Sequence, residues 1–588
     1  MSSPSCPLFR GMTRRDFMGS AATAAGTLIA PWLGLARQTY GGEQVTIEPE
    51  EQQRIEAVIP TKAFVTPRKS RKLLIFDLNV GYGGHPSIKT ANLAWTLMGE
   101  KTGAFETVIS RDPSVFKPEN LKSFDAVFLN NTVGNLFEDP ALRQSLIEFV
   151  YGGGGLLGVH GTSVAFTRWP GAYEDWPEFG IMLGARGANH RDSSEHVFIK
   201  LDDPGHPLNQ PFDGKGFEYR DEFFRFHEPY SRQKVRVLLS IDTDKTDTNQ
   251  GQARGDCFRE DNDYALAWVR QYGRGRIFYC TIAHNPYVFW DTKFLQFYLA
   301  AIQFVLGDLP APTTPSAKLT PASRSQEQLG WRLGGTPVSF DNFTLFEAID
   351  KTAELGLLYI GGSNLQTVSR DITKKFDEHL SNDELRQIRL KLDSAGVRLL
   401  TYHIHNTPSD LSAGYMADEA GYRKVFEFGR KMGIETFIDE PRPDMLDTIE
   451  RLCNEYDINL AITCFGRKTS PQYSNPEEVL KLCQSHSKRI GACGSLDFWL
   501  RSGISPIEAI RILRDRLLIL DTYQQDKTIS NSDETIKLVL DQIHRLGLKP
   551  TMFSIEYPHD KSISMSEIAQ SIEFFNNVSI QLAKKGKL

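Results

Sequence analysis

The stretch Gly152-Gly-Gly-Gly-Leu-Leu-Gly-Val-His160-Gly-Thr-Ser163 decides the fold of the first half of the chain. A glycine-rich turn leads into the short apolar run 156–159, which has the length and character of a strand buried on both faces of a parallel sheet. His160 follows directly after this run. Ligands bind beyond the carboxyl ends of the strands in open α/β sheets, so His160 is a candidate for chemistry.

Strand-like and helix-like segments alternate on both sides of this stretch. The apolar runs that we expect to be strands are 73–78, 105–109, 125–130, 156–159 and 275–283. Apolar residues at helical spacing predict helices over 88–99 and 141–151, and a closing helix that ends near Gly307. This alternation is typical of a doubly wound α/β domain with a parallel sheet, which we assign to residues 71–308.

A second pattern begins after a proline-rich segment. Residues 309–328, with prolines among Ala, Thr and Ser, are predicted to be a semi-rigid linker. Apolar strand candidates then alternate with helices, at 330–334, 357–361, 397–402, 434–438, 458–463, 490–493, 517–521 and 551–555. Eight βα units in about 250 residues predict a (β/α)8 TIM barrel over residues 329–588. An open doubly wound sheet alternates in the same way and is the alternative.

The composition is that of a globular protein with several domains. Of the 588 residues, 40% are hydrophobic and 24% are charged, which excludes disordered, collagen-like and membrane-bundle architectures. Sixty-seven Lys and Arg against 73 Asp and Glu give a net charge of −6, so no positive field attracts nucleic acid. The 7 cysteines form no CxxC pair, and buried free thiols with at most one bridge are expected.

Residues 1–40 have the character of an export signal. Thr13-Arg14-Arg15-Asp16-Phe17-Met18 precedes a weakly apolar run of small residues. This run is too short to span a bilayer, so no stable membrane anchor is expected. The segment resembles a twin-arginine signal peptide, which implies a periplasmic or secreted protein. A chance arginine pair on a disordered leader is the alternative, and residues 41–70 are predicted to be a charged spacer.

Other histidines follow other predicted strands of the first domain. His85 ends Gly-Tyr-Gly-Gly-His after the first strand, and His284 follows the strand at 275–283. Glu222 adds a carboxylate in an acidic segment. We predict one catalytic centre, assembled from His85, His160, Glu222 and His284. The alternative is a structural role, which is the stronger expectation for each of His190, His196, His206 and His227.

Aromatic side chains near these histidines are candidates for substrate binding. They are Trp169, Tyr173, Trp176 and Trp290. Their flat apolar faces suit stacking on sugar rings. Packing between loops is an equally good explanation of the same residues.

Three stretches of the first domain resemble the trehalose-utilisation (ThuA-like) family. They are Leu156 to Gly161, Asp221 to Phe224, and Ala267 through Tyr279 to His284. The resemblance implies the class I glutamine amidotransferase-like, flavodoxin-like fold and a sugar or glycoside as small-molecule partner. Amidotransferases of that fold place a cysteine nucleophile after the strand at 156–159. Because His160 stands there and cannot form the thioester, glutaminase activity is not expected.

The resemblance also implies chemistry on a keto-sugar. In a 3-keto-glycoside the carbonyl acidifies the hydrogen on C2, and the C1 oxygen lies β to that carbonyl. A base and an acid then promote elimination or hydrolysis, and histidine and Glu222 fit these roles. The alternative is a divalent metal held by histidines that stabilises the enolate, and the sequence predicts no other cofactor.

The second domain resembles the xylose isomerase-like sugar phosphate isomerase/epimerase barrels through residues 490–503, Ile-Gly-Ala-Cys-Gly-Ser-Leu-Asp-Phe-Trp-Leu-Arg-Ser-Gly. Ser495 and Phe498 stand where the resemblance implies metal ligands, and Thr463 and Phe465 depart from the family in the same way. The weak metal candidates that remain are His403, Glu440, Asp521 and Glu556. We expect a non-catalytic or substrate-binding barrel. A metal-dependent keto-sugar isomerase or epimerase in the barrel, or a non-enzymatic periplasmic sugar-binding protein, is the alternative.

We predict that export depends on Arg14 and Arg15. Changing both to lysine should leave the precursor in the cytoplasm, because twin-arginine export reads the arginine pair itself. Cell fractionation of the double variant measures this, with Arg10→Lys as the matched control. Normal export of the double variant would contradict the prediction.

Overall fold

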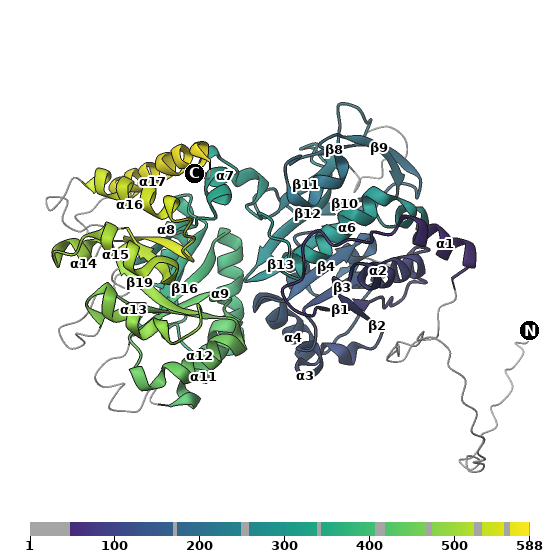
Figure 1. Ribbon diagram of the computed structural model, residues 1–588. Coiled ribbons are helices and arrows are strands. Elements are labelled where there is room, and N and C mark those ends of the chain that lie inside the picture. The colour runs from purple at the N-terminus through teal and green to yellow at the C-terminus, as the bar shows by residue number, and fades with distance from the viewer. Residues whose placement is uncertain are drawn as a thin grey trace, which may run out of the picture. The chain divides into compact units, whose positions relative to one another are not determined.

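The computed structural model describes residues 47–168, 173–248, 258–337, 343–405, 418–464, 473–522, 532–557 and 565–586. The predicted signal peptide, with Arg14 and Arg15, lies outside these ranges. Along the colour bar of Figure 1, an α/β domain drawn in purple to teal precedes a barrel drawn in green to yellow. Both predicted architectures are confirmed. Within the described ranges, no helix combines the length and apolar character needed to cross a membrane.

A nine-stranded sheet in the order β2-β1-β3-β4-β13-β12-β11-β8-β9 forms the first domain. Its parallel part contains the predicted strands, observed as β2 (Glu106–Ser110), β1 (Lys72–Phe76), β3 (Ala126–Asn130), β4 (Gly155–Val159) and β13 (Gly275–Cys280). Its antiparallel part, which the sequence analysis did not predict, adds β12 (Ala265–Tyr272), β11 (Arg236–Ile241), β8 (Glu195–Leu201) and β9 (Phe217–Asp221). The sheet is therefore mixed around a parallel core.

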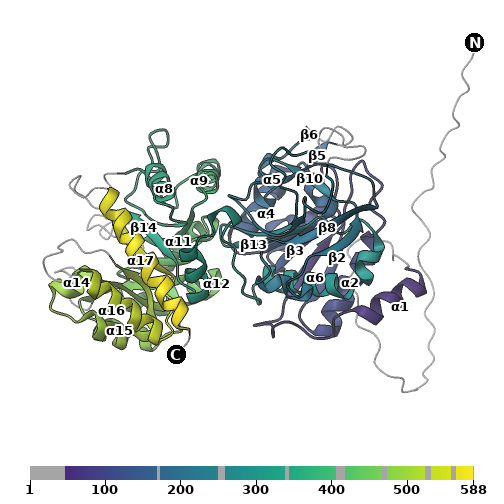
Figure 2. The same cartoon turned by 90° about the horizontal axis from the view of Figure 1, so that it is seen from above.

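Helices cover both faces of this sheet (Figures 1 and 2). Along β1, Leu73 and Ile75 belong to one core, and Leu74 and Phe76 belong to the other. The first core includes residues of α1 (Pro49–Val58), α2 (Ile88–Thr102) and α6 (Thr292–Val305). The second includes residues of α3 (Pro118–Leu121), α4 (Pro140–Tyr151) and α5 (Pro177–Leu183). Burial on both faces is why β1, β3 and β4 are continuous apolar runs in the sequence, whereas the edge strand β2 is only partly buried.

Short elements complete the first domain. They are η1 (Pro113–Phe116), η2 (His160–Val164), β5 (Thr167–Arg168), β6 (Tyr173–Glu174), β7 (Arg186–His190), η3 (Pro207–Phe212), β10 (Phe224–His227) and η5 (Pro286–Trp290). Helix α1 comes from the segment predicted to be a spacer, and its Ile55 is fully buried. The side-chain oxygen of Gln303 accepts hydrogen bonds from the backbone of Phe64 and Val65, at 2.8 and 3.3 Å. Part of the spacer is thus built into the domain.

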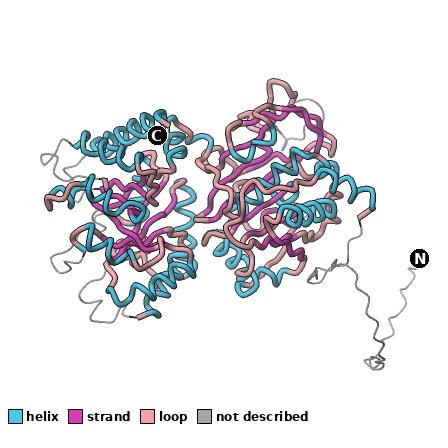
Figure 3. The backbone as a smooth tube through the Cα atoms, viewed as in Figure 1, coloured by secondary structure: helices cyan, strands magenta, loops and turns pink. Residues whose placement is uncertain are grey.

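The second domain is a closed barrel of parallel strands, surrounded by helices (Figure 3). The strands are β14 (Leu333–Pro337), β15 (Tyr359–Ser363), β16 (Arg398–His403), β17 (Thr436–Asp439), β18 (Asn459–Thr463), β19 (Ile490–Ser495), β20 (Leu517–Asp521) and β21 (Met552–Tyr557). The helices are α8 (Leu345–Glu354), α9 (Asn382–Ala395), α11 (Glu419–Lys431), η7 (Pro443–Met445), α12 (Leu446–Tyr456), α13 (Pro476–Gln484), α14 (Leu496–Arg501), α15 (Pro506–Leu513), η9 (Arg514–Arg516), α16 (Ser532–Arg545) and α17 (Met565–Lys585). Every predicted barrel strand overlaps an observed one.

The predicted linker contains η6 (Ser316–Lys318) and α7 (Pro321–Leu329), and residues Thr39–Leu588 form one compact unit. The Ser316 hydroxyl accepts a hydrogen bond from the backbone of Val237 at 2.9 Å. Arg274, in the β12–β13 turn, donates to backbone oxygens just before barrel strands β17 and β18, those of Ile434 at 3.2 Å and Asp457 at 2.9 Å. Direct contacts therefore join the domains, whose exact boundaries stay a prediction.

We predict that Gly155 is required for packing at the start of β4. A Cβ there would lie 2.8 Å from the Cβ of Ala126 and would also overlap the backbone of Val305. Gly155→Ala should lower the free energy of unfolding by about 1–3 kcal/mol, because a packed core resists added volume. Urea denaturation measures the change. Gly205→Ala, where a Cβ meets nothing within 4 Å, should stay within about 0.5 kcal/mol, and equal effects at both glycines would contradict the packing argument.

Candidate functional site

His160 occupies a sharp turn at the end of β4. Its φ of 42° lies in the left-handed region, which is uncommon for a residue with a Cβ and is found mainly where surrounding contacts enforce it. The hydroxyl of Tyr279 donates to the backbone oxygen of His160 at 2.7 Å, and the amide of the next residue, Gly161, donates to the side-chain oxygen of Asn131 at 3.3 Å. These contacts fix the turn and direct the imidazole to one position.

The tautomer of His160 follows from its neighbours. Nδ1 lies 2.8 Å from the backbone oxygen of Thr281, which only accepts hydrogen bonds, so Nδ1 carries the proton in the neutral ring. Nε2 therefore presents a lone pair, and it faces Oε1 of Glu222 at 3.2 Å. Two acceptors at this distance require either a shared proton or a cation between them.

His85 approaches His160 because the neighbouring residue is a glycine. The two imidazole rings meet edge to face with centroids 4.8 Å apart. A Cβ on Gly161 would lie 2.6 Å from Cε1 of His85, closer than real Cβ atoms come to other atoms. Glycine at position 161 is therefore required for the His85 ring to pack against His160.

Asp221 positions His284. Its two carboxylate oxygens accept hydrogen bonds from the backbone amides of His284 and Asn285, each at 3.1 Å, and from the side chain of Asn285 at 2.6 Å. Burial raises the pKa of Asp221 to about 7 against the effect of these donors. The next residue, Glu222, reaches the cluster, where its Oε2 lies 3.8 Å from Nε2 of His284.

The predicted catalytic residues are brought together. His85, His160, Glu222 and His284 each offer one ligand atom, and these atoms lie within 4.8 Å of one another. The rings of His160 and His284 have centroids 5.2 Å apart. The cluster is also mostly buried, with His160 fully so. The four residues therefore lie at one site, while the catalytic role of each residue stays a prediction.

Burial keeps the three imidazoles neutral. Together with the neighbouring imidazoles of His160 and His284, it lowers the pKa of His85 to about 2. It lowers the pKa of His160 far below its ordinary value and also lowers that of His284. The contacts with Glu222 are therefore hydrogen-bond contacts between a carboxyl group and neutral rings. Neutral imidazole is the form that ligates metals.

The donor set fits a divalent transition metal. Nδ1 of His85 and Nδ1 of His284 are buried and have no hydrogen-bond partner among the described residues. Imidazole nitrogens with one carboxylate oxygen suit zinc, manganese, cobalt or iron, whereas magnesium and calcium prefer oxygen ligands alone. The buried His, His, Glu and His group can thus bind a metal.

Two neighbours of the cluster were not among the predicted site residues. Nδ1 of His190 lies 3.2 Å from Oε2 of Glu222, although a structural role was the stronger expectation for this histidine. The ring of Tyr82 lies 5.0 Å from that of His85. Its position in Gly81-Tyr-Gly-Gly-His85 is a signal that the sequence contained, because a glycine-rich strand-to-helix loop brings its side chains to the ligand edge of the sheet.

The predicted aromatic residues have different surroundings. Trp169 lies outside the described residues. Trp176 is buried between Phe166 and Phe179, with centroids 4.8 and 5.9 Å away, which favours the loop-packing explanation. Tyr173 is exposed on β6, and Trp290 is half-buried under the guanidinium of Arg54 at 4.9 Å. Their binding of substrate stays a prediction.

The barrel candidates lie at strand ends but form no comparable group. His403 and Asp521 end β16 and β20, and Glu440 follows β17, where it accepts a hydrogen bond from the Thr463 hydroxyl at 3.1 Å. The side chain of Glu556 lies outside the described part of the chain. In the ranges that the structure describes, none of these candidates belongs to a set of three or more ligand atoms as closely spaced as the His85 cluster.

Several residues of the stretch 490–503 in the barrel have structural roles. The hydroxyl of Ser495 caps α14 by accepting from the backbone of Phe498 at 3.4 Å. Trp499 is fully buried, and a Cβ on Gly494 would overlap its indole ring. Arg501 pairs with Asp497 at 2.6 Å. Part of this stretch thus supports helix α14 and the core beneath it.

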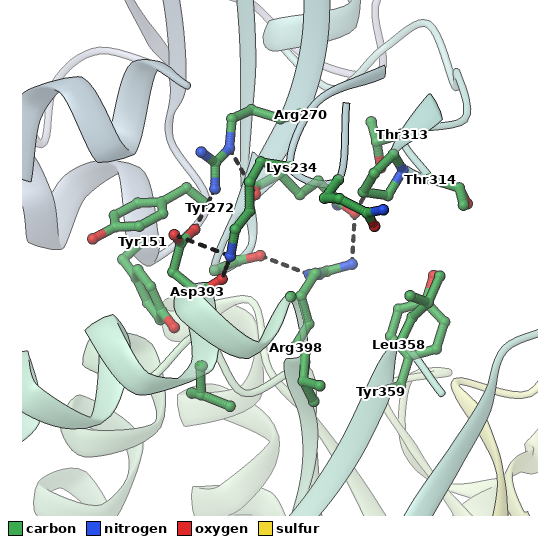
Figure 4. Close-up of a pocket in the computed structure, with 17 residues that line it drawn as sticks. Tyr151, Lys234, Arg270, Tyr272, Thr313, Thr314, Leu358, Tyr359, Asp393 and Arg398 are labelled. Carbon is green, nitrogen blue, oxygen red and sulfur yellow. Dashed lines mark hydrogen bonds and ion pairs between the residues drawn. The ribbon is translucent and has the colours of Figure 1, made fainter. Parts of the chain in front are cut away.

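A cavity of about 70 Å³ lies where β12 meets α9 and β16 (Figure 4). In the figure Lys234 and Arg270 converge on Asp393, with which both form ion pairs. Arg398 donates to the side-chain oxygen of Gln271 at 2.6 Å. Each of these cations has a protein partner, so the side chains around the cavity join the two domains. The cavity is therefore a weak candidate for a substrate site.

Comparison with known families gives one match. A family model described as Trehalose utilisation (ThuA) matches residues 72–305. No curated protein matches the chain. The matched residues contain His85, His160, Glu222 and His284.

Three solved structures illustrate the similarity of parts of this chain to known folds. A protein of uncharacterised function from Parabacteroides distasonis is 24% identical, over 42% of this chain and 99% of that one, with a TM-score of 0.35. A ThuA-like protein from Bacteroides uniformis is 21% identical, over 41% and 92% of the two chains, with a TM-score of 0.33. The 3-keto-D-glucoside 4-epimerase from E. coli is 8% identical, over 42% and 99%, with a TM-score of 0.33.

We predict that the cluster binds one divalent transition metal ion, and that His284→Gln weakens this binding at least about 100-fold, since loss of a supporting partner alone costs 10- to 100-fold. Equilibrium dialysis against cobalt or zinc, followed by metal analysis, measures it. His196→Gln is the matched control, because the side chain of His196 is exposed on strand β8 and pairs with Glu218 at 3.3 Å. Equal affinity in wild type and His284→Gln would contradict the shared metal site.

Proposed function

We propose that this protein is a carbohydrate-processing enzyme whose ThuA-like domain releases the aglycone from 3-keto-glycosides by elimination. One observation carries the proposal. Three neutral imidazoles and a carboxyl group converge within 4.8 Å, in a buried site at the ligand edge of a domain that matches the trehalose-utilisation family. Such a set is suited to polarising a carbonyl group and moving a proton beside it.

In the proposed arrangement the C3 carbonyl oxygen of the substrate points at the cluster. His85, His160, Glu222 and His284 would hold a divalent cation there. When bound, such a cation polarises a ketone and stabilises the negative charge that develops on its oxygen. The chain itself supplies a fixed ligand frame, through the Thr281 contact of His160 and the Asp221 clamp on His284.

The proton carrier in this proposal is His190. Nδ1 donates to the backbone oxygen of Arg191 at 2.7 Å and lies near Glu222, so the opposite ring nitrogen, Nε2, is the one left for substrate. Nε2 takes the proton from C2, the electron pair becomes the C1–C2 double bond, and the bond from C1 to the aglycone oxygen breaks. The same proton passes to the departing oxygen, so the products are an enone and an alcohol and no proton is consumed. Addition of water to the enone would complete a hydrolysis.

We propose further that the enzyme works in the periplasm or outside the cell. The supporting observation is the arginine pair before a short apolar run at the N-terminus. The barrel, whose described ligand candidates do not cluster, serves in this proposal as a binding module.

Methyl 3-keto-α-D-glucopyranoside tests the proposed reaction. Proton NMR should show release of methanol and formation of the enone by the wild-type protein. His190→Gln should lower turnover at least about 100-fold with the metal content unchanged, since a positioned acid or base contributes 10²- to 10⁴-fold. His196→Gln is again the matched control, because His196 is exposed on β8.

The same assay separates the alternatives. Glu440→Gln changes the barrel candidate that contacts Thr463. Loss of turnover in Glu440→Gln, with His190→Gln still active, would favour the isomerase or epimerase alternative in the barrel. Binding of the keto-glycoside without any turnover by the metal-loaded wild type would favour the non-enzymatic alternative.

A further inference from the structure

One buried side chain lies beside all three histidine loops of the cluster. Asn131 directly follows β3, which lies between β1 and β4 in the sheet, and it is fully buried. The loops that carry His85, His160 and His284 follow β1, β4 and β13, so each histidine comes from a different part of the chain. The relative position of the three imidazoles therefore depends on contacts between these loops.

The carboxamide of Asn131 contacts each of the three loops. Its Oδ1 accepts a hydrogen bond from the backbone amide of Gly161 at 3.3 Å. Its Nδ2 lies 3.3 Å from the backbone oxygen of Ala283 and 3.3 Å from the hydroxyl oxygen of Ser87. Each of the contacted residues is within two sequence positions of a cluster histidine. One side chain thus joins the three loops.

The orientation of this carboxamide follows from its partners. The amide of Gly161 only donates and the backbone oxygen of Ala283 only accepts, so Oδ1 faces the first and Nδ2 faces the second. The Ser87 hydroxyl donates to the same Ala283 oxygen at 2.6 Å, which leaves its lone pairs to accept from Nδ2. The loops after β1 and β13 are therefore linked twice, directly through Ser87 and through Asn131.

A chain of buried hydrogen bonds holds the Asn131 carboxamide. Nδ2 also lies 3.3 Å from Oδ1 of Asn130, whose own Nδ2 donates to Oδ1 of Asn92 at 2.8 Å. Asn92 donates to one carboxylate oxygen of Asp77 at 2.8 Å, and Arg111 donates to the other at 2.8 Å. The chain ends at this half-exposed arginine, so the buried carboxylate is paired. A connected network of this kind makes its members rigid.

The backbone of Asn131 suits a glycine replacement. Its φ of 54° lies in the left-handed region, which asparagine and glycine adopt more readily than other residues. Asn131→Gly therefore removes the carboxamide without straining the main chain. This variant separates the role of the side chain from the conformation of the turn.

We propose that Asn131 is a positioning residue that holds His85, His160 and His284 at the spacing required to bind one divalent cation. This inference rests on the proposed function, in which the cluster holds that cation. Asn131 is not a member of the ligand group, so it acts through the residues next to the ligands. Groups that orient metal ligands in this way affect metal affinity although they do not touch the ion.

Cobalt titration of the full-length protein, followed by visible absorption, tests the positioning role. Asn131→Gly should bind cobalt at least about tenfold more weakly than wild type, because loss of a group that orients a ligand costs 10- to 100-fold in affinity. The spectrum of the bound cobalt should also change, since it reports the ligand geometry. Circular dichroism establishes that the variant is folded.

A second variant decides the question if Asn131→Gly does not fold. Ser87→Ala removes the hydroxyl that joins Asn131 to the Ala283 oxygen. It should weaken cobalt binding at least about threefold, because one hydrogen bond between two of the loops is lost. Cobalt affinity equal to that of wild type in Ser87→Ala would then overturn the proposal.

The control variant removes a buried asparagine whose printed partners lie elsewhere in the domain. Asn209 is also fully buried, and its side chain donates to the backbone oxygens of Asp203 at 2.9 Å and Leu238 at 3.1 Å. Asn209→Ala should lower the stability toward urea but leave the cobalt affinity within about threefold of wild type.

The outcomes separate this inference from the proposed function. Wild-type affinity and spectrum in folded Asn131→Gly, or an equal loss of affinity in Asn209→Ala, would overturn the positioning role and leave the proposed function standing. If the wild-type protein binds no cobalt, the cation of the proposed function is wrong and this inference fails with it.

Discussion

The site depends on one backbone turn, the left-handed conformation of His160 at the end of β4. A residue with a Cβ adopts this conformation only where contacts enforce it, and here the enforcing groups come from other strands. Tyr279 on β13 holds the backbone oxygen, Thr281 holds Nδ1, and Asn131 after β3 holds the next amide. The parallel order β3-β4-β13 is what brings these groups together. The fold of the sheet is therefore a precondition of the imidazole's position.

Burial is the second constraint on the cluster. A charged imidazole in this environment would lose its hydration without a compensating charge, so burial favours the neutral ring at each histidine. The carboxyl group of Glu222 is subject to the same effect, and burial raises its pKa while His190 and His284 lower it. The result is a set of groups with lone pairs directed at a common point. A cation supplies the charge that such a set lacks.

Sequence patterns were sufficient for the architecture and for part of the site. Most of the parallel strands and the barrel strands are buried on both faces, so their apolar runs identified them. Of the four missed antiparallel strands, β8 and β9 contain exposed positions, among them His196 and Glu218, that interrupt their apolar character, whereas β11 and β12 are buried and could have been found. The four clustered residues were found because they follow strands or an acidic segment. His190 was not found, since its proximity to Glu222 depends on how β7 packs in three dimensions, whereas Tyr82 could have been found from its place in the glycine-rich loop before His85.

The contact made by Arg274 affects which parts of the barrel are free to vary. Its guanidinium donates to backbone oxygens that precede β17 and β18. The neighbouring Gly273 packs closely on Gly433, since a Cβ added to Gly433 would lie 3.1 Å from the Cα of Gly273. These barrel residues are at the amino-terminal ends of the strands. Insertions there would disrupt the contact between the domains. The carboxyl-terminal ends of the strands, where barrel enzymes carry function, are the opposite ends from those that Arg274 contacts.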